Sequence, residues 1–325
     1  MQINSFRTEI QRQRAEATIS HRDKIMLIGS CFAENIGEKL TKYKFYTDVN
    51  PFGILFNPVS IAQSLAILTD SFLFQENDLH FYNGEWFSFL HHGKFSHTNK
   101  EQCLKTINEK LVESRFFLKN ANFLILTLGS TIVYSYKGNV VANCHKIPQK
   151  EFEKQMLNVQ NIISNLMNSI EKIKAINKNI QLIFTVSPVR YIKNNMTENA
   201  LSKAQLIVAV HELIHRISNS YYFHAFEIMM DDLRDYRFYN EDMVHPSSLA
   251  IDYIWKDFSY TFFDESTINI NKTIKNILLA VNHRIKTPHL EENKKFRDIQ
   301  VKKIEQIQAL HPYISFNSEL DYFRD

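Results

Sequence analysis

The stretch that decides the fold of this chain is Lys24–Lys39, KIMLIGSCFAENIGEK. Four apolar residues lead into Gly29, two small nucleophilic side chains follow at Ser30 and Cys31, and a helix-forming segment begins at about Phe32. A buried strand, a glycine turn and a helix start place the turn at the carboxyl end of the strand, where open α/β sheets bind their ligands. The free N–H groups at the start of the helix would stabilise an anion that develops beside this turn.

Outward from this stretch, strand and helix patterns alternate along the chain. Further buried strands are predicted at residues 123–128, 182–186 and 221–227. Helices are predicted at residues 33–43, 60–68, 101–117, 149–175 and 202–217, with Ser60 as the cap of the second. This alternation predicts an α/β fold with a parallel sheet and helices on both faces.

Two β-hairpins are expected to interrupt the alternation. The first turns at residues 83–84, Asn-Gly, and the second at residues 137–139, Lys-Gly-Asn. After about Ile268 the sequence is helical and highly charged, which is typical of a solvated helical extension. We therefore expect one α/β domain over residues 1–265 and a helical C-terminal extension over residues 266–325.

The composition is that of an ordinary globular protein. Of the 325 residues, 44% are apolar and 22% are charged, and the length is sufficient for a sizeable core. The net charge of +3 is too small to indicate a broad basic face for nucleic acid. The three cysteines, Cys31, Cys103 and Cys144, include no short-spaced pair, which argues against a disulfide framework and against a cysteine-based zinc site.

Nothing in the sequence predicts export or insertion into a membrane. Residues 1–16 are polar and charged and lack the apolar core of a secretory signal. No window of about 18 apolar residues is present, so no transmembrane helix is expected. We therefore expect a cytoplasmic protein.

Three predicted strands end in glycine or small polar residues. These ends are residues 29–31, Gly-Ser-Cys, residues 129–131, Gly-Ser-Thr, and residues 187–188, Ser-Pro. Any one of them is typical of turn chemistry. Because the carboxyl ends of parallel strands meet at one edge of the sheet, the three together favour a pocket there.

The strongest candidate for a catalytic base lies near the other end of the chain, in residues 239–255, YNEDMVHPSSLAIDYIW. Asp242 precedes His245 by three residues, and Ser247 or Ser248 could cap the following helix. An aspartate in this position can accept the imidazole Nδ1–H, which leaves Nε2 to take a proton from a nucleophile. The Asp-x-x-His pattern is common by itself, but together with the turn after the first strand it makes a plausible triad.

Six segments of the chain resemble the motifs of the GSCFA family, which is named after the first of them. They are GSCFAENIG (29–37), NPFGILFNP (50–58), TLGS (127–130), ANCHKIP (142–148), TVSPVR (185–190) and EIMMDDLRDYRFYNEDMVHPS (227–247). The resemblance covers about residues 4–263, and the family is grouped with the SGNH or GDSL-type hydrolases. It implies a flavodoxin-like three-layer αβα sandwich and the hydrolysis of acyl esters, so that residues 1–265 would be a hydrolase domain.

The resemblance also implies roles for individual residues. The late Asp-x-x-His motif of the class falls on Asp242 and His245, and the glycine loop that supplies an oxyanion donor falls on Gly53. Backbone N–H groups of the nucleophile turn would complete the oxyanion site.

The third motif of the class, Gly-x-Asn-Asp, falls on residues 129–131. Gly129 matches its glycine, but Thr131 stands where the class has asparagine. The missing oxyanion donor could be the hydroxyl of Thr131, or it could come from Asn50 or Asn57 in a neighbouring loop.

Ser30 and Cys31 are both candidate nucleophiles. Alignment of the glycines places Cys31 at the serine of the class and Ser30 at its aspartate, whereas alignment on the serine makes Ser30 the nucleophile. A cysteine at a helix N-terminus beside a histidine would have a lowered pKa, and a serine would need His245 as its base. The serine-based chemistry of the class favours Ser30, in which case Cys31 would pack as a small residue beneath the turn.

Other polar residues could line the pocket. His92 and His145 lie in or beside the predicted hairpins, and Arg190 could bind a substrate anion, although structural ion pairs are the commoner role of arginine. His211 and His215 have the spacing of a zincin motif, HELIH. We interpret them as residues of a packing helix, because no third metal ligand is evident.

Three functions fit these observations. The first is hydrolysis of an O-acyl ester, such as an acetylated sugar or glycan, by a Ser/Cys-His-Asp triad that needs no metal or organic cofactor. The second is acyl transfer to an alcohol by the same residues. The third is non-catalytic carbohydrate binding, with the aromatic hairpin around Trp86 and Phe87 as a platform for a sugar ring.

Overall fold

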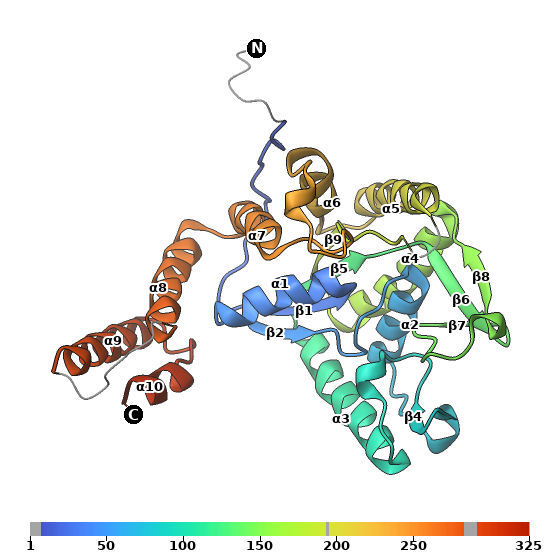
Figure 1. The fold of residues 1–325 in the computed structure, drawn as a ribbon, viewed down its shortest axis with the longest axis horizontal. Coiled ribbons are helices and arrows are strands. Elements are labelled where there is room, and N and C mark those ends of the chain that lie inside the picture. Colours follow the sequence, from blue (N-terminus) through green and yellow to red (C-terminus); the bar gives the residue numbers. More distant parts are fainter. Residues whose placement is uncertain (1–7, 193–194, 283–290, 325) are drawn as a thin grey trace.

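A five-stranded sheet in which all neighbouring strands are parallel forms the centre of the fold (Figure 1). The fold is given by a computed structural model, which describes residues 8–192, 195–282 and 291–324. Residues 1–7 of the expected domain and residues 283–290 of the expected extension lie outside the described residues. The strands of the sheet are β1 (Lys24–Gly29), β2 (Tyr46–Val49), β5 (Phe123–Leu128), β9 (Gln181–Val186) and β10 (Ser220–Phe223).

The order of these strands identifies the topology. They lie in the order β10-β9-β5-β1-β2, which is the flavodoxin-like order 2-1-3-4-5 when the strands of this sheet are numbered along the chain. The strands predicted at residues 123–128 and 182–186 are confirmed as β5 and β9. The sequence does not predict β2, because this edge strand reads YTDV and buries only Asp48, so no apolar run marks it.

Helices cover both faces of the sheet, because alternate residues of a strand point to opposite sides. Met26 and Ile28 of β1 pack against one helical layer, and Ile25 and Leu27 pack against the other. The first layer is α2 (Pro58–Thr69), α3 (Lys100–Lys119), α4 (Val159–Ile176) and α5 (Met196–Arg216). The second is α1 (Cys31–Lys42), α6 (Ala225–Glu227) and α7 (Ser248–Phe262). The predicted three-layer αβα sandwich is thus confirmed (Figure 1).

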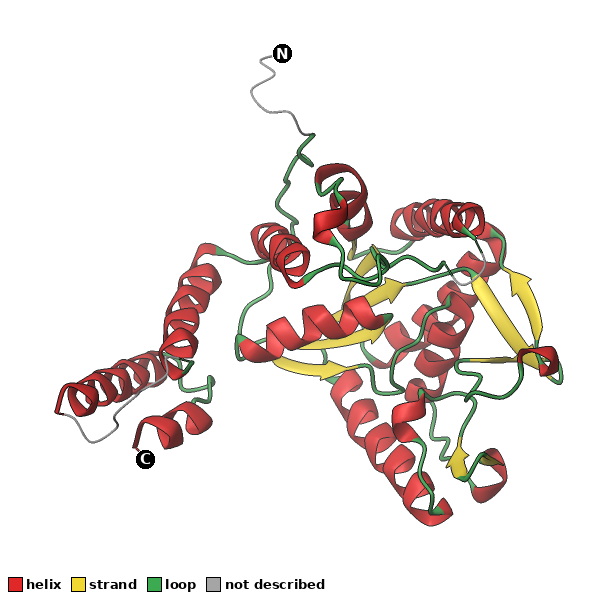
Figure 2. Cartoon of the chain, viewed as in Figure 1, coloured by secondary structure: helices red, strands yellow, loops and turns green. Residues whose placement is uncertain are grey.

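The two expected hairpins lie on the side of the sandwich away from the C-terminus (Figure 2). They are β3 (His80–Tyr82) with β4 (Glu85–Phe87), and β6 (Ile132–Tyr136) with β7 (Asn139–Val141). A further strand, β8 (Glu153–Met156), pairs with the other edge of β6. The second hairpin is therefore part of a small three-stranded sheet.

The helix predicted over residues 149–175 is wrong in its first part. Residues 153–156 are the strand β8, and α4 begins only at Val159, with Asn158 as its N-cap. Phe152 is buried among the aromatic residues of the hairpins, which brings the residues after it alongside β6. Tertiary packing has here overridden a local helical pattern.

Two other element boundaries differ from the prediction. Asn57, not Ser60, caps α2, because its Oδ1 accepts a hydrogen bond from the N–H of Ser60 at 2.8 Å. The strand predicted to reach Glu227 ends at Phe223, and the chain continues into α6 and a π-helical turn. The cause is helical spacing in that segment, where residues 225, 228 and 229 are all buried against the α7 layer.

The chain ends in a helical region beside the sandwich, as expected (Figure 2). It comprises α8 (Glu265–Val281), α9 (Glu291–Leu310) and α10 (Asn317–Arg324). The region has an apolar cluster of its own, which includes Ile274, Ile304 and Phe316. An ion pair between Lys44 Nζ and Glu319 Oε1 at 2.6 Å links it to the segment between α1 and β2.

Short helical turns complete the described secondary structure. They are the 3₁₀ turns Glu76–Asp78, Gly93–Phe95, Gln149–Glu151 and Tyr236–Phe238, and the π-helical turn Ile228–Asp232. None of the described helices combines the length and the apolar composition that are needed to cross a membrane.

Candidate active site

The turn after β1 is fixed by its neighbours at the edge of the sheet. Gly29 has a φ of +148°, and a Cβ atom there would lie 2.1 Å from the carbonyl oxygen of Thr127 on β5, so only glycine fits. The N–H of Gly29 donates to Oδ1 of Asn50 at 2.8 Å, and the N–H of Ser30 donates to the Thr127 carbonyl at 3.1 Å. The turn is thus held by the ends of two neighbouring strands.

Ser30 and Cys31 lie in different environments. Ser30 is 1% exposed, and its Oγ caps α1 by accepting a hydrogen bond from the N–H of Phe32 at 3.3 Å. Cys31 is the first residue of α1 and is partly exposed. Burial raises the pKa of its thiol, so the lowered pKa expected for a cysteine at this helix N-terminus is wrong; Glu34 adds to the effect of burial. Nearby backbone N–H groups and the charge of Lys203 lower the pKa but do not outweigh burial.

The predicted aspartate and histidine pair as expected. Oδ2 of Asp242 lies 2.6 Å from Nδ1 of His245, and Oδ1 accepts the N–H groups of Val244 and His245, each at 2.9 Å. These hydrogen bonds, with the backbone N–H of His245 as the largest influence, lower the pKa of Asp242 to about 2. With Nδ1 held by a carboxylate, Nε2 of His245 is the nitrogen that can accept a proton.

The loop that carries His245 runs beside α1. A cavity of about 420 Å³ is lined by Asn35 and Glu38 of α1 and by Asn240, Pro246 and Ser248 around the histidine. Asn35 lies one helical turn after Cys31 and therefore on the same face of α1. Within the described part of the chain, no hydrogen bond joins His245 to either candidate nucleophile.

The same loop is also joined to the segment that follows β9. The N–H of Arg190 donates to the carbonyl of Val244 at 3.2 Å, and its side-chain Nη1 donates to the carbonyl of Met243 at 3.3 Å. Ser247 caps α7, one of the two capping residues that were predicted. These contacts place His245 between the start of α7 and the carboxyl edge of the sheet.

Several residues expected to bind an oxyanion are engaged in the structure. The N–H of Gly53 donates to the carbonyl of Asn50 at 2.7 Å, and the N–H of Gly129 donates to the carbonyl of Phe56 at 2.8 Å. Asn57 uses Oδ1 to cap α2, and its Nδ2 donates to Oγ of Ser60 at 3.0 Å.

Asn50 has a donor that is not engaged. Its side chain is 1% exposed, its Oδ1 accepts the N–H of Gly29, and its Nδ2 makes no hydrogen bond within the described residues. Thr131 is also buried, and its Oγ1 likewise lacks a partner there. Of the two, Asn50 contacts the turn of residues 29–31 directly, whereas the N–H of Thr131 is bound to Ser202 Oγ at 2.8 Å.

The two histidines expected at the pocket mouth make structural contacts. His145 stacks on Phe87 at 4.0 Å, and its Nε2 lies 3.0 Å from the carbonyl of Ser88, which joins the two insertions. Burial lowers its pKa to about 4. Nδ1 of His92 accepts the N–H of Lys94 at 3.3 Å, and its Cβ packs against Gly53.

The HELIH segment lies within α5, where His211 packs against the ring of Tyr222 with centroids 5.0 Å apart. Within the ranges that the structure describes, no group of three or more His, Cys, Asp or Glu side chains is arranged to hold a metal ion.

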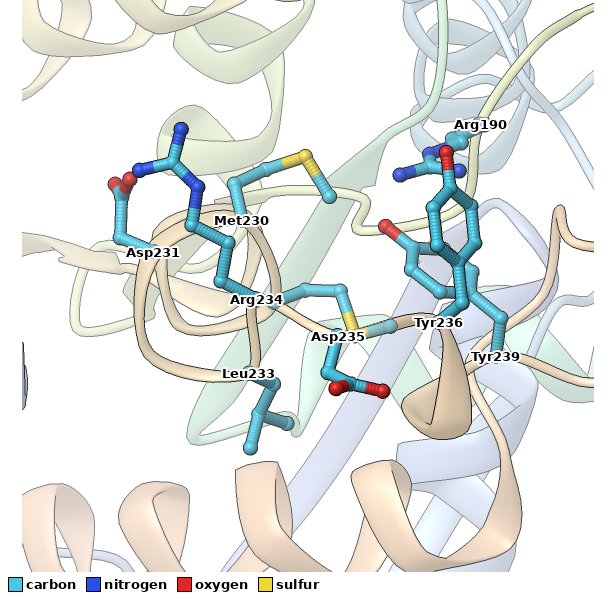
Figure 3. Close-up of a pocket in the computed structure, with 9 residues that line it drawn as sticks. Arg190, Met230, Asp231, Leu233, Arg234, Asp235, Tyr236 and Tyr239 are labelled. Atoms are coloured by element: carbon cyan, nitrogen blue, oxygen red, sulfur yellow. The ribbon is translucent and has the colours of Figure 1, made fainter. Parts of the chain in front are cut away.

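A second cavity, of about 380 Å³, lies next to the histidine loop (Figure 3). The guanidinium of Arg190 lies 4.0 Å from the ring centroid of Tyr239 and 5.5 Å from that of Tyr236. In Figure 3 these three residues stand on one side, and Asp231 and Arg234 stand opposite. No ion pair to a carboxylate is formed by Arg190 among the described residues. The predicted arginine therefore borders a cavity that opens beside the His245 loop.

Lys203 of α5 was not among the residues predicted from the sequence. It is 2% exposed, and its Nζ donates to the carbonyls of Gly129 and Ser187, both at 2.7 Å. The signal that could have found it is its position in the helix, because it shares helical register with the buried Leu206 and Val210. A lysine on the apolar face of a helix is buried, so it needs a polar partner inside the protein.

Comparison with curated proteins gives no match. Among solved structures, the chain is similar to a family 3 carbohydrate esterase from Clostridium thermocellum, at 12% identity and a TM-score of 0.36, over 78% of this chain and 98% of that one. It is also similar to a carbohydrate esterase family 3 from Talaromyces cellulolyticus, at 11% identity and a TM-score of 0.36, over 78% of this chain and 99% of that one.

Comparison with protein families agrees with the motifs of the sequence. Residues 274–325 match the model described as GSCFA domain protein, C-terminal domain. Residues 24–258, which include the turn of residues 29–31 and the Asp242–His245 pair, match the model of the GSCFA family. The chain therefore belongs to the GSCFA family.

Proposed function

We propose that the protein hydrolyses O-acyl esters, with Cys31 as the nucleophile, His245 as the base and Asp242 as the residue that orients it. The observation that carries this proposal is the 2.6 Å contact between Asp242 and His245 Nδ1. The loop that holds this pair runs beside the face of α1 that carries Cys31 and Asn35. A nucleophile, a base and an orienting carboxylate are the three parts that acyl transfer requires. The SGNH-type motifs of the sequence support the same class of reaction.

The reaction proceeds in two halves. Sγ of Cys31 attacks the acyl carbon while Nε2 of His245 takes the thiol proton, and the carbonyl oxygen becomes an oxyanion. Collapse of this intermediate expels the alcohol, which receives the proton from His245, and leaves a thioester on Cys31. Water then gives a proton to His245 as it attacks the thioester, and a second collapse releases the carboxylic acid and returns the proton to Sγ.

The environments of the two candidate nucleophiles favour Cys31. Ser30 is buried, and its Oγ is used to cap α1. Cys31 is partly exposed at the first position of the helix, where backbone N–H groups lack acceptors within the helix. A thiolate formed there lies beside the positive end of the helix dipole.

Two donors fit the oxyanion in this scheme. One is the backbone N–H of Cys31 itself, at the start of α1. The other is Nδ2 of Asn50, which is buried, has no hydrogen bond within the described residues and belongs to a side chain that already contacts Gly29. Such donors stabilise a developing negative charge most strongly where water is excluded.

The alcohol part of the substrate is proposed to be a sugar or glycan. The cavity of about 380 Å³ beside the histidine loop is lined by Tyr236, which is 66% exposed, and by Arg190. Aromatic rings pack against the apolar face of a sugar, and guanidinium groups donate to hydroxyl or carboxylate oxygens. Arg190 would thus bind the substrate next to His245.

The test is turnover of p-nitrophenyl acetate and of a peracetylated monosaccharide, with released acetate as the readout. We expect turnover of both, and labelling of Cys31 by iodoacetamide should abolish it. A sugar acceptor is added in a parallel assay, because an acylated acceptor as the main product would identify a transferase. Absence of turnover and of labelling by both iodoacetamide and a fluorophosphonate would instead favour a carbohydrate-binding protein.

A further inference from the structure

Arg190 has hydrogen-bond donors to spare beside the histidine loop. It lies in the segment that follows β9, at the carboxyl edge of the sheet, and it borders the cavity of about 380 Å³ (Figure 3). Its Nη1 donates to the carbonyl of Met243 at 3.3 Å, whereas Nε and Nη2 have no hydrogen bond in the part of the chain that the structure describes. Nε and Nη2 share one edge of the guanidinium, and such an edge binds the two oxygens of a carboxylate side by side. This edge is therefore available to a ligand.

The positive charge of Arg190 is held in place but is not neutralised. The guanidinium lies 4.0 Å from the ring centroid of Tyr239 and 5.5 Å from that of Tyr236. Contact with aromatic rings orients a guanidinium and removes part of its hydration, yet it supplies no counter-charge. Among the described residues no carboxylate forms an ion pair with Arg190.

The two carboxylates that line the cavity do not balance this charge. Both oxygens of Asp235 accept hydrogen bonds from Arg237, from Nε and from Nη2, each at 3.0 Å. In Figure 3 the side chains of Asp231 and Arg234 point toward one another, opposite Arg190. The side of the cavity with the two tyrosines therefore carries a single positive charge that has no counter-charge, which favours a ligand with one negative charge.

Tyr239 supplies a further donor on the same side. It is 8% exposed and lines the cavity, and its Oη makes no hydrogen bond within the described residues. A buried hydroxyl without a partner is unfavourable, so an acceptor from a ligand would stabilise it. Tyr239 forms an antiparallel bridge with Pro246, and the N–H of Asn240 donates to the carbonyl of His245 at 2.8 Å. The free hydroxyl and the proposed base are thus held by the same two backbone segments.

We propose that Arg190 and Tyr239 bind a carboxylate of the substrate, so that the protein acts on esters of an acidic sugar such as a uronic acid. The inference rests on the proposed function, because it names the class of sugar whose ester would be cleaved. The carboxylate accepts from Nε and Nη2 of Arg190 and from Oη of Tyr239, and the sugar ring packs against the exposed ring of Tyr236. Because Arg190 contacts the loop at Met243, the bound sugar lies next to the loop that carries His245.

The first test compares two substrates that differ in one group. They are a methyl glucuronoside and a methyl glucoside that carry acetyl groups on the same ring hydroxyls, with released acetate as the readout. The wild type should prefer the glucuronoside by about 10-fold to 100-fold in kcat/KM, because only the carboxylate can form a charged hydrogen-bonded pair with the guanidinium. Equal kcat/KM values for the two substrates would overturn the inference.

Substitution of either donor should reduce this preference. Arg190→Gln keeps an N–H for the carbonyl of Met243, and the ratio of the two kcat/KM values should fall to about one, through a higher KM for the glucuronoside. Tyr239→Phe should lower the ratio by about threefold or more without lowering the melting temperature, because the lost hydroxyl has no hydrogen bond among the described residues. Arg216→Gln, which removes an exposed arginine paired with Glu212, is the matched control and should keep the wild-type ratio.

A role in packing alone predicts the opposite pattern, in which stability falls and the ratio stays at its wild-type value. That pattern in either donor variant would reject the assignment. If Arg190→Gln does not fold, Arg190→Lys takes its place, because lysine keeps the charge but not the paired N–H groups. Its ratio should lie below that of the wild type, and an unchanged ratio would show that the paired edge binds no carboxylate.

Binding can also be measured without turnover. Titration calorimetry of the wild type should show that glucuronate binds at least about tenfold more tightly than glucose. The difference should shrink at high salt, because Arg190 is partly exposed. Tighter binding of inorganic phosphate than of glucuronate would reject the carboxylate as the ligand.

The proposed function and the acidic sugar can fail separately. A protein that hydrolyses p-nitrophenyl acetate but does not distinguish glucuronate from glucose would keep the proposed function and lose the acidic sugar. A protein that hydrolyses no ester, but whose binding of glucuronate is lost in Arg190→Gln, would keep the carboxylate site and lose the proposed function.

Discussion

The nucleophile turn and the histidine loop, which we propose to act together, are built in opposite ways. Gly29 and Ser30 of the turn are buried and are held by residues from distant segments, Asn50 and Thr127. The loop is open to solvent, with the side chains of Asp242 and His245 49% and 43% exposed, and most of its hydrogen bonds join residues within the loop. Its links to the sheet run through Arg190.

This difference predicts which substitutions should change stability as well as activity. A change in the turn should affect stability as well as activity, because each of its groups also supports a strand end or a helix end. A change in the loop should affect activity alone, because exposed pairs contribute little to the stability of the folded chain. Four experiments test this contrast, from the largest expected effect to the smallest.

Replacement of the nucleophile should have the largest effect. In Cys31→Ala, kcat/KM for an acetyl ester should fall by at least about 10⁴-fold, because the covalent step is lost. Ser30→Ala should lose about 1 kcal/mol of unfolding free energy with its helix cap, but less than about tenfold in kcat/KM. Steady-state kinetics measure kcat/KM, and urea unfolding measures the unfolding free energy. The reverse pattern, with activity lost only in Ser30→Ala, would make Ser30 the nucleophile.

Replacement of the orienting carboxylate should have the next largest effect. Asp242→Asn should lower kcat by about 10²-fold to 10⁴-fold, because the amide cannot hold His245 in the tautomer that accepts a proton at Nε2. The melting temperature should stay within about 2 °C of the wild type, because the pair is exposed. Glu241→Gln, at the neighbouring position, is the control for a lost negative charge. Equal activity of Asp242→Asn and wild type would remove the triad from the proposal.

Removal of the free donor in the turn should give a smaller loss. Asn50→Asp keeps an oxygen for the N–H of Gly29 but removes the N–H groups of Nδ2, so kcat should fall by about 10²-fold with little change in KM. Asn57→Asp keeps the oxygen that caps α2 and should lower kcat much less. Kinetics of the two variants under identical conditions measure the difference. Similar losses in both would show that Asn50 has no special relation to the oxyanion.

The buried histidine His91 should make the stability of the protein depend on pH. His91 is 2% exposed and stacks on Phe52, and burial lowers its pKa to about 3. Because the unfolded chain has a pKa of about 6.5 there, its stability contribution is present above that pH and is lost as the pH falls toward 3. The contribution of His91 to the unfolding free energy should therefore fall by up to about 1.4 kcal/mol per pH unit below about 6.5.

The corresponding variant is His91→Phe, which keeps an aromatic ring among Phe52, Phe74 and Phe95. Guanidinium unfolding at pH 7, 6 and 5 should show a shallower pH dependence in this variant than in the wild type. The variant should still show a smaller slope of the same sign, because burial also lowers the pKa values of His21 and His145 to about 4. Identical slopes in wild type and variant would mean that His91 is not held neutral by the fold.

The sequence by itself determined the parts that depend on neighbours along the chain. The unit of β1, glycine turn and α1 follows from an apolar run and a helical pattern. The pairing of Asp242 with His245 also follows, because three residues separate them and one turn of the loop brings them together. For the same reason the strands β5 and β9 were predicted at their observed positions.

Only the tertiary structure decided the parts that join distant segments. Asn50 reaches Gly29 across 21 positions, and Lys203 reaches the carbonyl of Gly129 across 74. Contacts of this length leave no local periodicity in the sequence, so the burial of Ser30, the partial exposure of Cys31 and the burial of Lys203 were not predictable. The order of the strands at the sheet edge brings these groups together, and that order is set by packing of the whole core.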